Sequence, residues 1–445
     1  MTNWYKVREL VDLKILDIPM DGNHGEIHPI SKDFVKEGIP FIMSSDINNG
    51  NVDFKNCKFL SKKQTLKLRK GFSLYGDVLL THKASIGRTA INKFKDDEFI
   101  MLTPQVTYYR IINDNKLNNK FLKYYFDSSF FQTTIKAWSD AGSTRAYIGI
   151  TKQLDLPIYL PKIESQQKIA DVLSLLDDKI ELNNKINIEL EQMAKTLYDY
   201  WFVQFDFPDA NGKPYKSSGR KMVWNEELKR EIPEGWAVKT LLDIANFVNG
   251  LACQKFRPNE NEDSYRVIKI REMGTGFTEN SEFVSKKIPE KVVVENGDIL
   301  FSWSATLDVK MWTGGRGALN QHIFKITSND FPKSYYFFEL LNYLQHFKMQ
   351  AELRKTTMGH ITQDHLKQSR ITNPPMDLIN KLDGIIKPIL EKKVKLEEEN
   401  QELSKLRDWL LPMLMNGQVT VGDAEEMVGN ELNMVAEGDV EYKKN

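Results

Sequence analysis

The segment 161–205, PKIESQQKIADVLSLLDDKIELNNKINIELEQMAKTLYDYWFVQF, decides the fold that we expect for this chain. Neither Gly nor Pro interrupts it after Pro161. Its mainly apolar seam repeats at alternating steps of four and three, the a/d period of a coiled coil. The seam consists of Ile169, Leu173, Leu176, Ile180, Asn183, Asn187, Leu190, Ala194, Leu197 and Trp201. A helix of about forty residues is roughly 60 Å long and needs a partner along its seam.

A second segment near the end of the sequence has the same period. Its seam consists of Leu382, Ile386, Ile389, Lys393, Leu396, Asn400, Leu403, Arg407, Leu410 and Leu414. Pro388 predicts a kink or a later helix start, because proline removes a backbone donor. We predict that the two helices pair as an antiparallel coiled coil in which Asn187 faces Asn400. The alternative is two unrelated amphipathic helices that pack on separate cores.

Composition restricts the class of protein. A chain of 445 residues is long for a single core, which favours several domains. Lys plus Arg equals Asp plus Glu at 61 each, so the net charge does not indicate a nucleic-acid partner. Two cysteines cannot form a disulfide framework, and the first residues are charged where a signal peptide would be apolar. No apolar stretch is long enough to span a membrane. We therefore expect a soluble cytoplasmic protein.

The segments before the two helices repeat each other in the same order. GWAVKTLLDI resembles WYKVRELVDL, GDILFSWSA resembles GDVLLTHKA, and ALNQHIFKI resembles LTPQVTYYRI. We infer an internal duplication and predict an α+β fold, with two mixed α/β domains separated by the two long helices. The expected boundaries are 1–160 for the first domain, 161–207 for the first helix, 208–232 for a linker, 233–374 for the second domain, 375–417 for the second helix and 418–445 for a disordered acidic tail.

Signals for nucleic-acid binding are local. Residues 58–70, KFLSKKQTLKLRK, hold six basic residues and no acid, which suits phosphate contact or a solvated helix face. Two polar and basic loops beside a glycine occur at matching places in the repeat, and other polar residues follow the predicted strands. The candidate DNA-contacting residues are Lys62, Lys63, Arg69, His82, Lys83, Arg88, Ser143, Thr144, Arg145, Lys269, Arg271, Ser302, Trp303, Lys355, Thr356, Thr357 and His360. Each of them alone is an ordinary surface residue, and their recurrence in both halves supports a role.

Three fragments imitate catalytic or metal sites. Asn373-Pro374-Pro375-Met376 resembles a methyltransferase signature but lacks its aromatic residue, so we interpret it as the turn that enters the second helix. Asp209 and Glu227 outline a nuclease site but lie in the linker without strand-like alternation. His24 and His28 lie in a loop that predicts no helix. We therefore predict no catalytic, cofactor or metal residues in this chain.

Several segments resemble the specificity subunit of type I restriction-modification systems. They are NGKPYKSSGRKMVWNEELKREIPEGW, the GDVLL and GDILF strands, SQQKIADVLSLLDDKI and LSKLRDWLLPMLMNGQ, and the resemblance fails only at the acidic tail. It implies two target-recognition domains that each read one half of a bipartite double-stranded DNA site. It also implies two modification subunits and two restriction subunits as partners, which carry S-adenosylmethionine, ATP and Mg. Three rivals are a two-headed DNA-binding regulator or orphan subunit, a scaffold that does not touch DNA, and a single-chain nuclease-methyltransferase whose motifs are missing.

Overall fold

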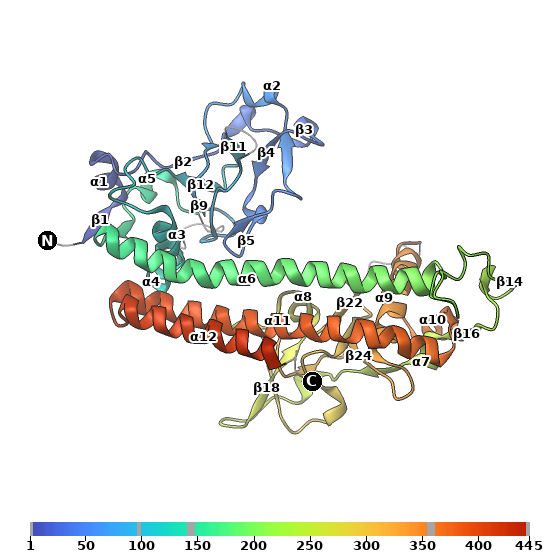
Figure 1. Ribbon diagram of the computed structural model, residues 1–445. Helices are drawn as coiled ribbons and strands as arrows, with labels where there is room; N and C mark the ends of the chain where they lie inside the picture. Colours follow the sequence, from blue (N-terminus) through green and yellow to red (C-terminus); the bar gives the residue numbers. More distant parts are fainter. Residues whose placement is uncertain (1–2, 96–98, 140–146, 354–360, 442–445) are drawn as a thin grey trace. The chain divides into compact units, whose positions relative to one another are not determined.

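The computed structural model describes residues 3–95, 99–139, 147–353 and 361–441, and the chain divides into two compact units. The first unit comprises residues 1–180 and 402–445, and the second comprises residues 181–401. Each unit contains a mixed α/β head and parts of two long helices, α6 (Ile163–Tyr198) and α11 (Met376–Asn416) (Figure 1). The long helices begin close to the predicted positions.

The head of the first unit contains two larger sheets, besides a short antiparallel pair of β5 (Ile47–Asn48) with β6 (Asn51–Val52). The first sheet has the order β10-β9-β12-β2, with all neighbours antiparallel, and consists of Thr89–Ile91, Val78–Thr81, Val106–Tyr109 and Met20–Asp21. The second has the order β3-β7-β4-β11-β8 and consists of Phe34–Val35, Lys58–Leu60, Ile39–Ile42, Ile100–Leu102 and Phe72–Ser73. Within it only β4 and β11 run parallel.

The head of the second unit repeats this topology. Its antiparallel sheet has the order β22-β21-β24-β17 and consists of Asp308–Met311, Ile299–Ser302, Ile323–Thr327 and Asn246–Asn249. The other sheet, β19-β18-β23-β20, consists of Phe283–Ser285, Ser264–Ile268, Gly317–Leu319 and Val293–Val294, and only β18 and β23 are parallel. Apart from the additional edge strand β3 in the first head, the strand order and the single parallel pair are the same, which confirms the internal duplication.

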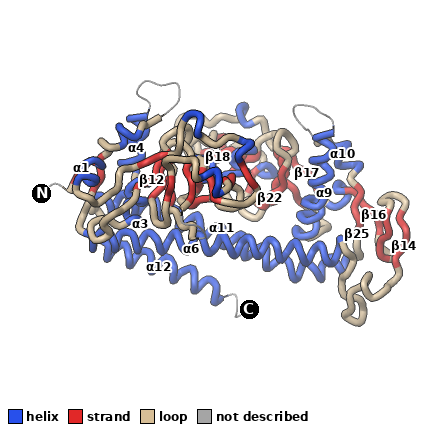
Figure 2. The backbone as a smooth tube through the Cα atoms, turned by 90° about the horizontal axis from the view of Figure 1, so that it is seen from above, coloured by secondary structure: helices blue, strands red, loops and turns tan. Residues whose placement is uncertain are grey.

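Further helices complete each head. The first head has α1 (Val7–Asp12), α2 (Lys62–Thr65), α3 (Asn119–Asp127), α4 (Ser129–Ser139) and α5 (Ile150–Gln153). The second has α7 (Leu241–Ile244), α8 (Ile270–Thr275), α9 (Lys333–Leu353) and α10 (Gln363–Gln368). Each head closes with an antiparallel pair just before its long helix. In the first head β1 (Trp4–Lys6) pairs with β13 (Pro157–Tyr159). In the second head β16 (Ala237–Thr240) pairs with β25 (Arg370–Asn373) (Figure 2).

The long helices contact each other in opposite directions. Within the second unit, Asn183 Nδ2 donates to Asn400 Oδ1 at 2.9 Å, and Lys393 Nζ lies 3.1 Å from Glu191. Residue numbers therefore rise along α6 as they fall along α11, so the two segments are antiparallel there. Within the first unit, Arg407 Nη1 donates to Asp177 Oδ1 at 2.7 Å.

The predicted pairing of Asn187 with Asn400 is wrong. Asn400 accepts from Asn183, one helical turn earlier, and its own Nδ2 donates to Asn184 Oδ1 at 2.9 Å. Asn187 is 4% exposed, and neither polar atom of its side chain has a hydrogen-bond partner among the described residues. The sequence repeat aligned Asn187 with Asn400, but side-chain packing between the helices sets the axial stagger, which the repeat does not encode.

The seam residues are buried or half-buried. Those in buried positions are Ile169, Leu173, Leu176, Leu382, Ile386, Leu396, Leu403 and Leu410, and those in half-buried positions are Ile180, Leu190, Leu197 and Ile389. Pro388 lies inside a helix that already begins at Met376, so the later start considered from the sequence is wrong. A π-helical turn, Asp199–Val203, follows α6.

The tail and the linker are more ordered than their composition predicted. The tail forms α12 (Val421–Glu441), and its Ala424 and Val428 are buried in the core of the first unit, so the prediction of disorder is wrong for these residues. Apolar residues four apart give even this acidic segment one side that packs. The linker contains a hairpin of β14 (Met222–Asn225) and β15 (Arg230–Pro233).

Candidate nucleic-acid interface

In the first head, three strand ends meet at one edge of the antiparallel sheet. Thr81, the last residue of β9, pairs with Val106 at the start of β12, and the next residue, Thr107, pairs with Asp21 at the end of β2. The chain leaves the sheet at this edge through His82 and through Gly22. A Cβ on Gly22 would lie 1.9 Å from the Leu102 carbonyl oxygen, so only glycine fits.

His82 lies at this edge and is fully buried. Its Nε2 is 3.0 Å from the Pro104 carbonyl oxygen, and its Nδ1 is 2.7 Å from Gln153 Nε2 and 2.5 Å from Thr107 Oγ1. Burial lowers the pKa of His82 to about 4, an effect that nearby Asp21 opposes. The imidazole is therefore neutral near pH 7, with Nε2 donating and Nδ1 accepting. We predicted direct DNA contact by His82, and its burial makes that prediction wrong.

His82 and Gln153 instead hold the chain that follows residues 140–146. The Ile148 amide donates to the His82 carbonyl oxygen at 3.1 Å, and Gln153 Nε2 donates to the Ile148 carbonyl oxygen at 3.0 Å. Exposed Lys83 pairs with Tyr147 through a β-bridge, with Lys83 Nζ 5.8 Å from the ring centroid. The predicted contacts Ser143, Thr144 and Arg145 lie outside the described residues, but the chain that follows them is fixed beside Lys83.

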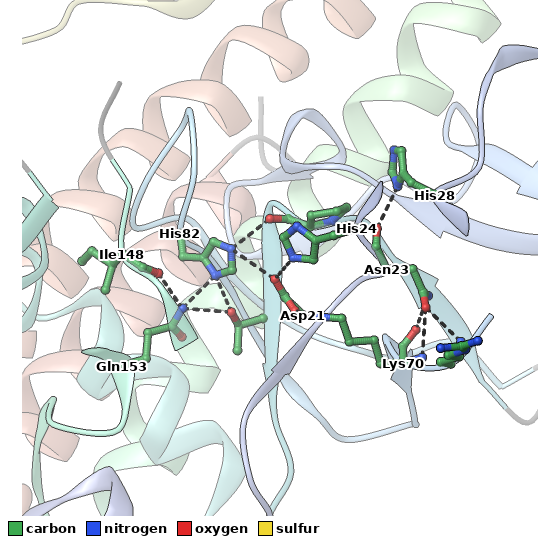
Figure 3. A network of polar contacts seen from close by, with 11 residues as sticks. Asp21, Asn23, His24, His28, Lys70, His82, Ile148 and Gln153 are labelled. Atoms are coloured by element: carbon green, nitrogen blue, oxygen red, sulfur yellow. Dashed lines mark hydrogen bonds and ion pairs between the residues drawn. The ribbon is translucent and has the colours of Figure 1, made fainter. Parts of the chain in front are cut away.

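Asp21 connects this edge to the basic segment 58–70 (Figure 3). It is 2% exposed, and its carboxylate binds Lys70 Nζ, lies 2.6 Å from His24 Nε2 and lies 4.0 Å from His82 Nε2. Asn23 Oδ1 accepts from the Arg69 amide at 2.9 Å and from the Lys70 amide at 3.3 Å. The structure thus joins two candidate regions that the sequence placed apart.

The basic segment itself lies largely on the surface. Lys62, Lys63 and Arg69 are exposed, around the short helix α2. Lys63 and Arg69 form no side-chain ion pair among the described residues. Arg88 has a structural role instead, because its Nη1 donates to the Ser44 and Ile47 carbonyl oxygens and to Asn48 Oδ1 at 2.9–3.2 Å.

The second head builds the same edge from different side chains. Ser302 pairs with Ile323, and Asn249 pairs with the next residue, Phe324, so Asn249 takes the place of Asp21. Trp303 takes the place of His82, and its carbonyl oxygen accepts from the Ile361 amide at 2.9 Å. Trp303 Nε1 donates to Asn249 Oδ1 at 3.4 Å.

The predicted contacts of the second head have different environments. Ser302 is fully buried, and its hydroxyl donates to the Thr306 carbonyl oxygen, so our prediction of DNA contact by Ser302 is wrong. Lys269 forms an ion pair with Glu282, and Arg271 Nη2 lies 2.6 Å from Glu272, which is 1% exposed. These acids compensate the charge of both residues. The predicted contacts Lys355, Thr356, Thr357 and His360 lie outside the described residues.

The fragments around Asp209 and Asn373 that imitate catalytic sites have structural roles here. Asp209 forms an ion pair with Arg220 and accepts from the Asn211 and Lys213 amides at 2.8 and 2.9 Å, which lowers its pKa. Glu227 pairs with Arg370 at 3.0 Å, and Asn373 ends β25 just before α11. Among the described residues, no three His, Cys, Asp or Glu side chains gather as metal ligands would. None of the described helices combines the length and apolar character needed to cross a membrane.

The sequence patterns did not indicate a role for Asp21, Asn23, Gln153 or Asn249. The repeat did contain a signal. The equivalent strands β2 and β17 each end in a polar residue, Asp21 or Asn249, and a glycine follows directly in both cases. Gly250 is constrained like Gly22, since its Cβ would lie 2.2 Å from the Asn320 carbonyl oxygen. The equivalence of Asp21 and Asn249 is apparent only from the register in which β2 pairs with β12 and β17 pairs with β24.

Known proteins share this architecture. The family model described as "Type I restriction modification DNA specificity domain" matches residues 21–192 and 233–406. The type I restriction enzyme MjaIX specificity subunit of Methanocaldococcus jannaschii is 27% identical over 407 residues, covering 88% of this chain and 89% of that protein. The HindI specificity subunit of Haemophilus influenzae is 25% identical, covering 86% and 94%. A crystal structure of the S subunit of a type I restriction-modification system from M. genitalium aligns with a TM-score of 0.53 at 16% identity, covering 92% and 95%.

Proposed function

The chain belongs to the type I restriction-modification DNA specificity family, and we propose that each of its two heads reads one half of a bipartite double-stranded DNA target. The observation that carries this proposal is the repeated sheet edge. In both heads, the residue that follows the central strand holds a returning segment at the same place. The Ile148 amide donates to the His82 carbonyl oxygen in the first head, and the Ile361 amide donates to the Trp303 carbonyl oxygen in the second. The strand register at this edge is the same in both heads and the side chains differ, as expected of two modules that read different sequences.

A domain exchange tests this proposal. Residues 235–374 are replaced by the same region of a relative, and the methylated adenines of the host genome are sequenced before and after. We expect one half of the methylated site to change and the other half to stay the same. A change in both halves, or in neither, contradicts independent reading. A reciprocal exchange of residues 1–160 is the matched control, because it should alter the opposite half.

We propose further that α6 binds a modification subunit and that the chain itself performs no catalysis. Leu182, Ile186, Ile188 and Met193 are 52%, 37%, 58% and 47% exposed on α6 within the second unit. Several apolar side chains exposed on one helix suit a protein partner. The family resemblance implies a complex of this chain with two modification and two restriction subunits. In that complex the partner subunits would bind S-adenosylmethionine, ATP and Mg.

Co-purification tests the scaffold role. Leu182→Glu combined with Ile186→Glu should reduce recovery of the modification subunit, whereas Glu189→Lys, at an exposed polar position on the same helix, should not. The purified chain alone should neither methylate nor cut DNA and should support methylation only when the modification subunit is added. Methylation by the chain alone would refute the non-catalytic proposal. Unchanged recovery of the partner with the double variant would refute the docking face.

A further inference from the structure

The two heads carry different side chains at one equivalent position, the end of strands β2 and β17. A difference in side chain at a conserved strand register points to a specificity element. Asp21 and Asn249 occupy the same register position in the two heads, each at the end of its strand and each followed by a sterically required glycine. Asp21 lies beside His82 and Asn249 lies beside Trp303, the two residues whose carbonyl oxygens hold the returning segments. The fold keeps the backbone at this position and changes the chemistry.

Stability does not explain the charges in the first head. A carboxylate that is 2% exposed is costly unless it is paired, and Asp21 is paired with Lys70 Nζ and accepts a hydrogen bond from His24 Nε2. The second head forms the same edge with a neutral Asn249–Trp303 pair. The fold therefore does not require the buried carboxylate, and a further role would account for it.

That role is visible at His24. Its side chain is 48% exposed, while Asp21 Oδ2 holds its Nε2 at 2.6 Å. Since the carboxylate accepts the Nε2 proton, Nδ1 is the ring nitrogen left for a ligand, and it makes no hydrogen bond among the described residues. A neutral Nδ1 accepts from the amino group of adenine or cytosine, and a protonated Nδ1 donates to guanine. Both His24 and His82 approach the same carboxylate oxygen, Asp21 Oδ2, so the His24 ring lies near the residue that holds the chain following residues 140–146 (Figure 3).

We propose that His24, positioned by Asp21, is a specificity-determining residue that contacts a base edge in the half-site of the first head, and that Asn249, at the register position of Asp21, contacts a base edge directly in the second head. This inference rests on the proposed function. Lys70 fixes the Asp21 carboxylate, and the carboxylate fixes the His24 imidazole. The imidazole would therefore present a rigid donor or acceptor to the DNA. Lys63 is exposed in the same basic segment as Lys70 and would contact phosphate, which carries no sequence information.

The test uses the full chain in complex with its modification subunit and duplexes in which each base pair of the target is substituted in turn. His24→Ala should reduce discrimination by about 10-fold or more at one base pair of one half-site and leave the other half-site unchanged. Asn249→Ala should do the same in the opposite half-site. Lys63→Ala is the matched control and should weaken binding to every duplex alike. Asp21→Asn should relax the same base pair as His24→Ala, because it loosens the imidazole without removing it.

The outcomes separate this inference from the proposed function. Uniform weakening by His24→Ala identifies a phosphate contact and overturns the inference, and so does an unchanged binding profile. Thermal melting of each variant, expected within a few degrees of the wild type, shows that altered binding does not result from unfolding. If the wild-type complex itself does not distinguish its target from a scrambled duplex, the proposed function fails instead.

Discussion

Glu339 on α9 makes the stability of the second unit depend on pH. Its carboxyl group is buried in an aromatic core, where the Tyr198 hydroxyl donates to Glu339 Oε1 at 2.7 Å. Burial raises the pKa of Glu339 from 4.5 to about 7, although the Tyr198 hydrogen bond and the nearby Arg230 partly oppose this shift. We predict that Glu339→Gln stabilises the protein at alkaline pH relative to the wild type.

The magnitude follows from the two pKa values. Because the folded state holds the Glu339 proton more tightly than the unfolded chain, the protonated group stabilises the fold fully below about pH 4.5, and this contribution is lost as the pH rises through about 7. The total amounts to about 3 kcal/mol. Most of it disappears between pH 5 and pH 8.5, so the stability of Glu339→Gln relative to wild type should improve by about 2 to 3 kcal/mol over that interval. Comparing both proteins at each pH cancels the other titrating groups.

Urea unfolding followed by tryptophan fluorescence measures this difference. Trp201 and Trp236 belong to the same core as Glu339 and report on it directly. Glu260→Gln removes an exposed carboxylate of the same unit and is the control, for which we expect the same relative stability at both pH values. If Glu339→Gln shows no larger advantage at pH 8.5 than at pH 5, the raised pKa is wrong and the reasoning fails.

Three other perturbations test separate parts of the structure. Asn400→Leu leaves the fully buried Asn183 amide without its acceptor and should cost about 1–3 kcal/mol in chemical denaturation, whereas adding Asn183→Leu should recover stability. Truncation after Thr420 removes α12 and uncovers the core that Ala424 and Val428 fill, so the melting temperature should fall, while truncation after Asn433 should change it little. Asp209→Asn should leave methylation by the assembled complex intact, since Asp209 pairs with Arg220, and loss of turnover with normal DNA binding would contradict its structural role.

Local periodicity and repetition in the sequence determined the architecture. Helix formation along α6 and α11 depends on residues three and four apart, so the seam could be recognised from residues such as Leu173, Leu176 and Leu403 without knowledge of their partners. The duplication predicted two heads with the same strand order, since the same segments in the same order fold through the same local and neighbouring-strand contacts. The family resemblance rested on these segments.

Contacts between distant residues were decided only by the tertiary structure. The sequence repeat equated Asn187 with Asn400, but the axial stagger of the helices places Asn183 opposite Asn400. The His24–Asp21–Lys70 arrangement depends on the pairing of β2 with β12 and on Asn23 binding the backbone at Arg69, none of which leaves a periodic signal. Burial likewise removed His82 and Ser302 from the surface, because a polar residue after a strand reads the same in sequence whether its side chain turns inward or outward.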